Sequence, residues 1–239
     1  MGFIKPNLPT SIQFYLTSSY PCSYLPQERA RSLVAAPAHI IDNQTYPSLI
    51  EVGFRRSGNF TYRPHCDQCQ ACTPIRVDTT NFAPSRSQRR TQKRFAHLEA
   101  FRKPLAWNAE HYALYRQYQA QRHAGSEMDN DDKSQYMDFL LTSQVDSYFI
   151  EFRDQGELVM VALVDEVPNG LSAVYTFFNP TISCLGTYGS LWQIHYCQQN
   201  KLNWLYLGYW IEQSRKMSYK TQFAPYQLFC HGQWIVPPL

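Results

Sequence analysis

Side chains that bind metals crowd into one short stretch of the 239-residue sequence: His65, Cys66, Cys69 and Cys72. The Cys-x-x-Cys-x-x-Cys spacing brings thiolates within reach of one ion, and thiolates suit zinc or an iron–sulfur cluster. A ferredoxin-type run would need a further cysteine where Arg76 stands, so the fourth ligand would be His65 or the distant Cys22. The alternative of buried or free thiols in a reducing compartment stays open.

Basic side chains form the second concentration, between residues 82 and 103, where Glu99 is the single acid. Helical spacing places four of them on one side of an expected helix at 86–94: Arg86, Arg89, Arg90 and Lys93. Arginine predominates and compensating acids are missing, which favours contact with nucleic-acid phosphates. An ordinary solvated face is the alternative.

Further cations are candidates for binding a carboxylate or a phosphate: Arg55, Arg56, Arg63, Lys216 and Lys220. Gly53 and Gly58 flank the arginine pair and indicate tight backbone geometry that could aim the guanidiniums, but an exposed hairpin with ordinary surface arginines is the favoured alternative. Asp165 closes an apolar strand, where a carboxylate at a cleft can be tuned for proton transfer. A simple turn residue is the other interpretation of Asp165.

The pattern of apolar and turn residues predicts the elements that position these side chains. Residues 1–80 are expected to form a turn-heavy Cys/Arg-rich domain, and residues 81–239 a second domain that carries the basic helix. The acidic run 129–132 fits the N-terminus of a helix, with a metal site as the alternative. Expected helices lie at about 86–94, 110–123, 188–200 and 210–215, and expected strands at 61–63, 75–77, 146–153, 158–165, 171–179 and 203–207. Three adjacent strands, a helix and a further strand indicate a mixed sheet with helices on its faces, of the α+β or mixed α/β class.

Composition limits the class of protein. Hydrophobic residues make up 44% and charged residues 17%, which is typical of a globular chain, and the net charge is only +3. No apolar run approaches the length of a membrane span, and no apolar leader follows the first methionine. The seven cysteines are an odd number, unlike a secreted disulfide framework. These features predict a soluble intracellular protein with no membrane partner.

Several long motifs resemble those of the aminoacyl-tRNA–protein transferases, and more narrowly of the bacterial aspartate/glutamate leucyltransferases, relatives of the eukaryotic arginyl-tRNA–protein transferases. The strings that carry the resemblance are YLPQERAR, GFRRSGNFTYRPHCDQCQACTPIRV, FAPSRSQRR, VALVDEVPNGLSAVYTFF, LGTYGSLWQI and LGYWIEQSRKMSYK. They run in order from about residue 15 to the C-terminus.

The resemblance implies a core like that of the GNAT acyltransferases and a cytoplasmic location. It also implies the transfer of leucine from leucyl-tRNA to proteins that begin with Asp or Glu. The modified protein would then become a substrate for proteolysis. Transfer itself is expected to need no cofactor. Eukaryotic relatives build a metal or cluster site from an early Cys-x-x-Cys and a later Cys-Cys, but here Leu25 and Ala71 replace two of those cysteines. A zinc or iron–sulfur site would therefore need Cys66 or Cys69 alongside Cys22 and Cys72.

Roles follow for the candidate residues as hypotheses. The basic helix would hold the acceptor-stem phosphates of tRNA. The side-chain carboxylate of the protein substrate would be bound by members of one cationic set: Arg55, Arg56, Arg63, Arg76, Lys216 and Lys220. Asp165 would orient or deprotonate the substrate amine, while Tyr175 and Tyr188 would line the cleft and donate to the developing oxyanion.

Three alternatives remain at this point. The donor is arginyl-tRNA instead of leucyl-tRNA, or the protein binds RNA without catalysis through a Cys-metal knuckle. The third is an acetyltransferase that uses acetyl-CoA, which is disfavoured because SCLGTYGS stands where a R/Q-x-x-G-x-G/A phosphate loop would be expected.

Overall fold

The computed structural model of the protein describes residues 11–122 and 132–237. Within these ranges the largest element is an eight-stranded sheet in the order β14-β13-β7-β12-β11-β10-β9-β8. Its strands are β7 (Thr73–Asp78), β8 (Glu99–Lys103), β9 (Ser147–Asp154), β10 (Glu157–Val167), β11 (Gly170–Phe178), β12 (Trp204–Trp210), β13 (Tyr226–Cys230) and β14 (Gln233–Ile235). Neighbouring strands are antiparallel except β11 and β12, which pair in parallel.

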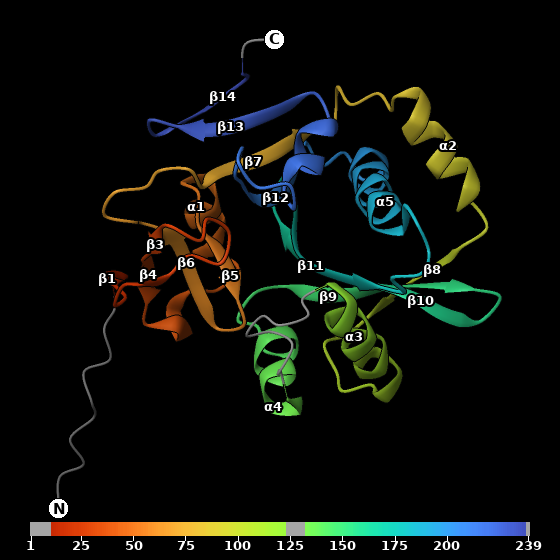
Figure 1. Cartoon of the computed structure of the whole chain (residues 1–239), viewed down its shortest axis with the longest axis horizontal. Helices are drawn as coiled ribbons and strands as arrows, with labels where there is room; N and C mark the ends of the chain where they lie inside the picture. The colour runs from red at the N-terminus through yellow and green to blue at the C-terminus, as the bar shows by residue number, and fades with distance from the viewer. Residues whose placement is uncertain (1–10, 123–131, 238–239) are drawn as a thin grey trace, which may run out of the picture.

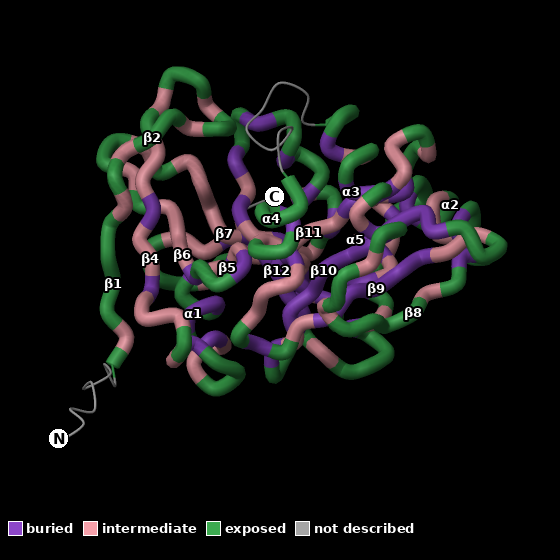
Figure 2. Tube along the Cα trace, turned by 90° about the horizontal axis from the view of Figure 1, so that it is seen from below, coloured by how far each residue is buried: buried purple, intermediate pink, exposed green. Residues whose placement is uncertain are grey.

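Helices cover both faces of this sheet (Figure 1). They are α2 (Arg86–Arg94) and α5 (Leu185–Gln199) on one face, and α3 (Ala109–Arg122), α4 (Lys133–Tyr136) and the π-helical turn η3 (Met137–Leu141) on the other. Because β10 is covered on both faces, its residues from 158 to 164 are all apolar and buried, and Asp165 after them is buried as well. Figure 2 shows β10 as a buried strand, whereas β1 at the far end of the molecule is exposed.

A four-stranded sheet in the order β1-β4-β6-β5 packs beside the large sheet (Figure 1). The elements of this region are β1 (Gln13–Leu16), β2 (Tyr20–Pro21), β3 (Arg29–Ala30), β4 (Ser32–Ala36), the 3-10 turn η1 (Ala38–Ile40), α1 (Tyr46–Glu51), β5 (Arg55–Ser57) and β6 (Phe60–Pro64). Its core joins Tyr46, Ile50 and Phe54 to Val167 and Tyr206 of the large sheet. Strand β5 lies against β11 of the large sheet.

Local sequence explains where the exposed helices begin. Ser85 accepts a hydrogen bond from the backbone N–H of Gln88, and the Gln88 side chain accepts one from the N–H of Ser85, which makes a capping box for α2. Asp132 and Gln135 make the same arrangement for α4. The expectation that the acidic run caps a helix is thus confirmed at Asp132, while residues 129–131 and the expected stop at Gly125 lie outside the described residues.

The predicted α+β class is confirmed, and most predicted elements are present with shifted ends. The helix expected at 188–200 begins at Leu185, and the strand expected at 203–207 continues to Trp210. The helix expected at 210–215 is wrong. Trp210 is still paired with Thr73 of β7, and turns follow it before the 3-10 turn η4 (Ser218–Gln222). Pairing across the sheet overrides the helical pattern there.

The predicted boundary at residue 80 and the relation to the GNAT acyltransferases stay predictions. Strand β7 lies before that boundary and pairs with β12 and β13 in the large sheet. Among the described helices, none is long and apolar enough to cross a membrane.

Candidate functional site

A cavity of about 440 Å³ opens where β11 and β12 separate. The two strands pair in parallel from Gly170 opposite Trp204 to Ser172 opposite Tyr206, and the pairing then stops. Beyond that level, β11 contributes its residues 173–176 to the wall and β12 contributes Leu207. Backbone groups that leave a strand pair need new partners, so this parting both makes space and exposes polar atoms.

The first two turns of α5 form another side of the cavity through Gly186, Thr187 and Ser190. Cys184 precedes the helix in the left-handed conformation, with φ of 68°, and its side chain caps none of the free N–H groups. The positive end of a 15-residue helix therefore faces the cavity without a side-chain cap. Such a terminus stabilises negative charge on a bound molecule.

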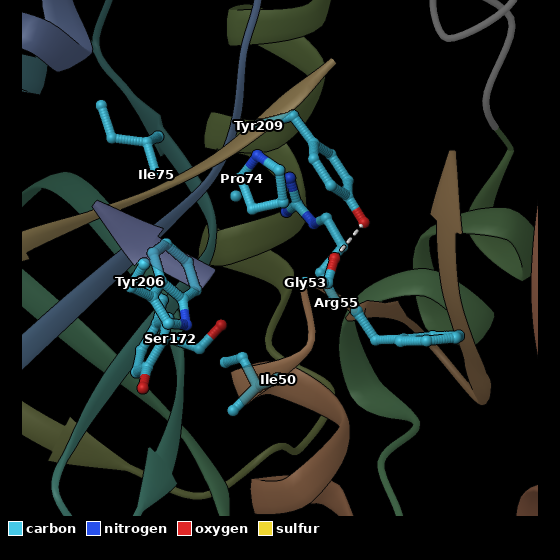
Figure 3. Close-up of a pocket in the computed structure, with 11 residues that line it drawn as sticks. Ile50, Gly53, Arg55, Pro74, Ile75, Ser172, Tyr206 and Tyr209 are labelled. Atoms are coloured by element: carbon cyan, nitrogen blue, oxygen red, sulfur yellow. Dashed lines mark hydrogen bonds between the residues drawn. The ribbon is translucent and has the colours of Figure 1, made fainter. Parts of the chain in front are cut away.

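Arg55 reaches the cavity from β5. Its Nη2 donates to the carbonyl oxygen of Val174 at 2.8 Å, and its guanidinium carbon lies 6.0 Å from the centre of the Tyr209 ring. The Tyr209 hydroxyl in turn donates to the carbonyl of Gly53 at 2.9 Å, as the dashed line in Figure 3 marks. Within the described chain, Arg55 makes no ion pair and one hydrogen bond, so most of its N–H groups are left for a ligand.

Lys220 lies beside Arg55 in the same cavity and is only 6% exposed. Its Nζ donates to the carbonyl oxygen of Tyr209 at 2.6 Å, and no carboxylate of the described chain pairs with it. Burial, together with the nearby positive charge of Arg55, lowers the pKa of Lys220 to about 7, while Cys72 acts in the opposite direction. Lys220 can therefore change charge near neutral pH.

The charge of the cavity is one-sided. Four cationic residues line it, and no Asp or Glu is among its described lining residues: Arg55, Arg122, Lys216 and Lys220. Ala173, Val174 and Leu207 supply an apolar wall next to these cations. The cavity is therefore suited to a ligand that combines an anionic group with an apolar one.

Arg56, the next residue of β5, lies elsewhere. Its Nε donates to both carboxylate oxygens of Asp165 at 3.0 Å, and the two side chains are 3% and 0% exposed. Ser147 also donates to Asp165, at 2.6 Å. Neither Arg56 nor Asp165 is among the residues that line the cavity. This closed ion pair favours a structural role for Asp165, and its predicted catalytic role stays a prediction.

Arg76 and Arg63 are also separate from the cavity lining. The guanidinium of Arg76 lies 3.7 Å from the ring centre of Trp204 and 4.3 Å from that of Trp234. It donates to Glu51 at 3.0 Å, so its charge is already balanced. Arg63 donates to a backbone carbonyl and lies over the Phe54 ring. Of the four predicted arginines, the structure therefore brings Arg55 alone into the described cavity lining.

The two candidate tyrosines have different surroundings. Tyr175 lines the cavity, and its hydroxyl donates to Gln119 at 3.3 Å. Tyr188 is 7% exposed and packs against Phe95 and Phe152 in the core beneath α5. Burial raises the pKa of Tyr188. The roles of both tyrosines stay predictions, and Tyr175 has the position that such a role requires.

The basic face of α2 is exposed at each predicted phosphate ligand: Arg86, Arg89, Arg90 and Lys93. Its other face is anchored by Gln88, which donates to the carbonyl of Gln222 at 2.8 Å. At the end of the helix, Arg94 donates to Ser183 at 3.1 Å, one residue before Cys184 of the cavity lining. The C-terminal end of α2 thus lies next to the cavity lining.

The predicted metal ligands are free cysteines: Cys22, Cys66, Cys69 and Cys72. Burial, followed by the nearby Cys22, Cys66 and Cys69 thiols, raises the pKa of the Cys72 thiol to about 12, so the four cysteines lie near one another. No group of three or more His, Cys, Asp or Glu in the described residues is arranged to hold a metal ion. The zinc or iron–sulfur site stays a prediction.

The sequence analysis did not identify five residues that line the cavity: Tyr118, Arg122, Thr187, Ser190 and Tyr219. It also missed Gly208, which lies next to the cavity. Most come from helix turns whose spacing carries no chemical signature. Gly208 is the exception, because a glycine inside the aromatic strand sequence WLYLGYW signals a bulge or a close approach.

The chain is similar to known proteins over most of its length. The model of the family Arginine-tRNA-protein transferase, N terminus, matches residues 20–90, and that of its C terminus matches residues 110–230. Aspartate/glutamate leucyltransferases from Nitrosospira multiformis and Thiobacillus denitrificans are 55% and 56% identical, covering 95% and 93% of this chain and 92% and 94% of their own. The one from Chromobacterium violaceum is 52% identical and covers 95% of each chain.

A solved structure with a weaker likeness is the C-terminal domain of a putative lysylphosphatidylglycerol synthetase from Agrobacterium fabrum. It is 11% identical with a TM-score of 0.48, over 78% of this chain and 60% of that one. The family matches span most of the chain, and the relatives match nearly all of it. The chain belongs to the arginine-tRNA-protein transferase family.

Proposed function

We propose that this enzyme transfers leucine from leucyl-tRNA to the N-terminal amine of proteins that begin with Asp or Glu. One observation carries the proposal: Arg55 and Lys220 lie uncompensated beside an apolar wall in one cavity. The names of the 52–56% identical relatives support the same reaction.

Arg55 and Lys220 would bind the side-chain carboxylate of the acceptor protein. Arg55 uses one donor on Val174 and retains others for a charge-assisted pair. Lys216 lines the same cavity and is exposed, so it would approach the acceptor from the mouth. Carboxylate recognition by buried donors rejects the neutral amide analogue, because the buried donors would then lack their charged partner.

The donor would approach along α2. Phosphates of the tRNA acceptor stem would contact the exposed basic face, and the aminoacyl end would enter past Arg94 and Ser183. The leucyl side chain would pack on Ala173, Val174 and Leu207. This direction leads the ester carbonyl toward the uncapped first turn of α5.

The reaction needs alignment more than activation. The acceptor amine, with an ordinary pKa of about 7.7–8.0, is partly neutral at cellular pH, and its nitrogen attacks the carbonyl carbon of the ester. The carbon–nitrogen bond forms, the bond from carbon to the 3′-oxygen of tRNA breaks, and the proton lost by nitrogen is balanced by the one gained by that oxygen. N–H groups of α5 would stabilise the oxyanion between these steps, and Tyr175 would contact the amine or the oxyanion.

The positive charge of the cavity favours a leucyl donor over an arginyl donor. An arginyl side chain would bring a guanidinium among four cations, with no carboxylate in the described lining to offset it. A leucyl side chain meets an apolar wall without that repulsion. The cytoplasm, which holds charged tRNA, is the compartment that this reaction requires.

The test mixes purified protein with labelled Leu-tRNA or labelled Arg-tRNA and peptides that begin with Asp, Glu, Asn or Gln. We expect label on the Asp and Glu peptides, from Leu-tRNA, and little on Asn and Gln. Equal transfer to Asp and Asn peptides would refute carboxylate recognition. RNA binding without any peptide-bound label would support a non-catalytic RNA-binding protein instead.

A further inference from the structure

The guanidinium of Arg55 occupies the place where two strands lose their register. Strand β11 carries a bulge at Val174, because β10 pairs Leu163 with Tyr175 and then Val164 with Ala173. Strand β12 has an irregularity against β7 between Tyr206 and Tyr209. Val174 is the residue whose carbonyl accepts from Arg55. The arginine thus supplies a donor that the parted strands no longer provide to each other.

Gly208 lies within the irregularity of β12 and borders the same guanidinium. Its φ is +75°, a conformation that favours glycine. A Cβ at this position would lie 2.3 Å from Nη1 of Arg55 and 3.0 Å from its Cζ. Both distances are far below van der Waals contact, so any side chain at residue 208 would displace the guanidinium.

We propose that Gly208 is a specificity-determining residue: the absence of its side chain sets the Arg55 guanidinium between β11 and β12, in position for the acceptor carboxylate. This inference rests on the proposed function of Arg55. Gly208 acts through Arg55 and is therefore a positioning residue. Its effect falls on the choice of acceptor and leaves the tRNA face on α2 unchanged.

The chain offers matched controls for the backbone effect. Gly156 and Gly232 have φ of +90° and +81°, and a Cβ added at either would meet nothing within 4 Å. Gly156 lies in the turn between β9 and β10, and Gly232 in the turn between β13 and β14. Alanine at these positions carries the strain of a positive φ without a clash. Comparison with Gly208→Ala therefore separates the steric effect on Arg55 from backbone strain.

The experiment measures kcat and KM for Asp-starting and Asn-starting peptides in Gly208→Ala, Gly156→Ala and Gly232→Ala. We expect Gly208→Ala to raise KM for the Asp peptide by about tenfold or more, because a well-placed hydrogen bond from the charged Arg55 is lost. The Asn peptide and the KM for Leu-tRNA should change by less than about twofold, and the control variants should resemble the wild type for both peptides. Equal losses for the Asp and Asn peptides would overturn the proposal.

The Arg55→Ala background tests whether Gly208 acts through Arg55. There, Gly208→Ala should add no further loss, because the side chain that it displaces is gone. An additional loss would assign Gly208 to the general stability of β12. If Arg55→Ala itself leaves the preference for Asp over Asn intact, the assigned function of Arg55 fails, which is a different outcome.

A second variant keeps the test decisive if Gly208→Ala does not fold. Lysine at residue 55 lacks the Nη atoms nearest to the added methyl group, so Arg55→Lys/Gly208→Ala should fold and show the KM of Arg55→Lys. Failure of this double variant to fold, with Arg55→Lys stable, would refute the steric link.

Discussion

Arg55 and Arg56 are neighbours on β5, yet they lie in opposite electrostatic surroundings. Arg56 is 3% exposed and meets the Asp165 carboxylate through Nε and Nη2. Arg55 reaches a cavity whose described lining adds three more cations and no acid. Alternation along the strand sends the two side chains to different faces, and the partners found there differ.

The difference separates a charge that supports the fold from a charge available for binding. A buried ion pair with all its hydrogen bonds made is costly to break from one side, because the remaining partner stays buried and unpaired. A cation without an acid beside it raises the potential in its cavity and attracts an anion. Identical residue types, adjacent in sequence, thus serve stability at one position and recognition at the next.

The largest expected effect is on the stability of the Arg56 region. Asp165→Asn should lower the free energy of unfolding by about 3–5 kcal/mol, because Arg56 is left without its charge partner. Arg56→Met/Asp165→Leu, which removes both charges, should lose less. Denaturant unfolding measures both variants, and the activity per folded molecule of Asp165→Asn is measured in parallel. Full stability with a large fall in turnover would instead establish Asp165 as a catalytic residue.

The next effect is on recognition in the cavity. Arg55→Ala should lower kcat/KM for an Asp-starting peptide about 30- to 1,000-fold, which corresponds to about 2–4 kcal/mol of lost transition-state binding. It should change the free energy of unfolding far less than Asp165→Asn does. Arg63→Ala is the control, since Arg63 contacts a backbone carbonyl and the Phe54 ring. Steady-state kinetics with Asp and Asn peptides measures both. An equal loss in the control would show that the comparison between these arginines is wrong.

The sequence predicted the main elements of the fold, but not which of the candidate residues reach the cavity. Strands 158–165 and 171–179, and the basic helix at 86–94, follow from apolar periodicity and charge, and the structure contains all three. Nothing local distinguishes Arg55 from Arg56, because their partners are distant: Val174 for one and Asp165 for the other. The same limit applies to Tyr175 and Tyr188, of which the fold brings only Tyr175 to the cavity. Long-range packing decides these cases, and the family resemblance alone cannot assign them.

A smaller effect should appear in the pH dependence of the cavity. The pKa of Lys220 is lowered to about 7 by burial and then by Arg55, with Cys72 opposing. The backbone carbonyl of Tyr209 and the ring of Tyr219 also face its Nζ. Lys220 therefore loses its charge as pH rises through that value, and succinate, a dicarboxylate without an amine, should bind more weakly at about pH 8 than at about pH 6. In Lys220→Met the dissociation constant for succinate should hardly change between these two pH values. Calorimetric titration measures it, and an unchanged slope in the variant would remove Lys220 from the anion site.

The same group should affect stability, with a sign fixed by linkage. The pKa of Lys220 falls from 10.5 to about 7 on folding, so between these values the unfolded chain binds more protons. The free energy of unfolding should thus rise with pH from about 7 to about 10 because of Lys220. Below about pH 7, where Lys220 is charged in both states, the destabilisation caused by burying its charge should be at its full size. Relative to Lys220→Met, the wild type should gain stability across this window. A gain that is absent, or reversed in sign, would show that Lys220 is not desolvated in the folded protein.

The smallest effect per residue is expected on the exposed face of α2. Changing Arg86, Arg89, Arg90 or Lys93 to Gln should reduce the steepness of the plot of log affinity for tRNA against log salt concentration by about 0.9 for each phosphate that is no longer neutralised. Lys201→Gln is the control, since that exposed lysine follows the opposite end of α5. Filter binding across a salt series gives the slopes. Because these exposed cations have no acid partner in the helix, removing one should cost binding and leave unfolding nearly unchanged. A slope that stays the same would place α2 with the ordinary solvated surface, and the donor would then need another route to the cavity.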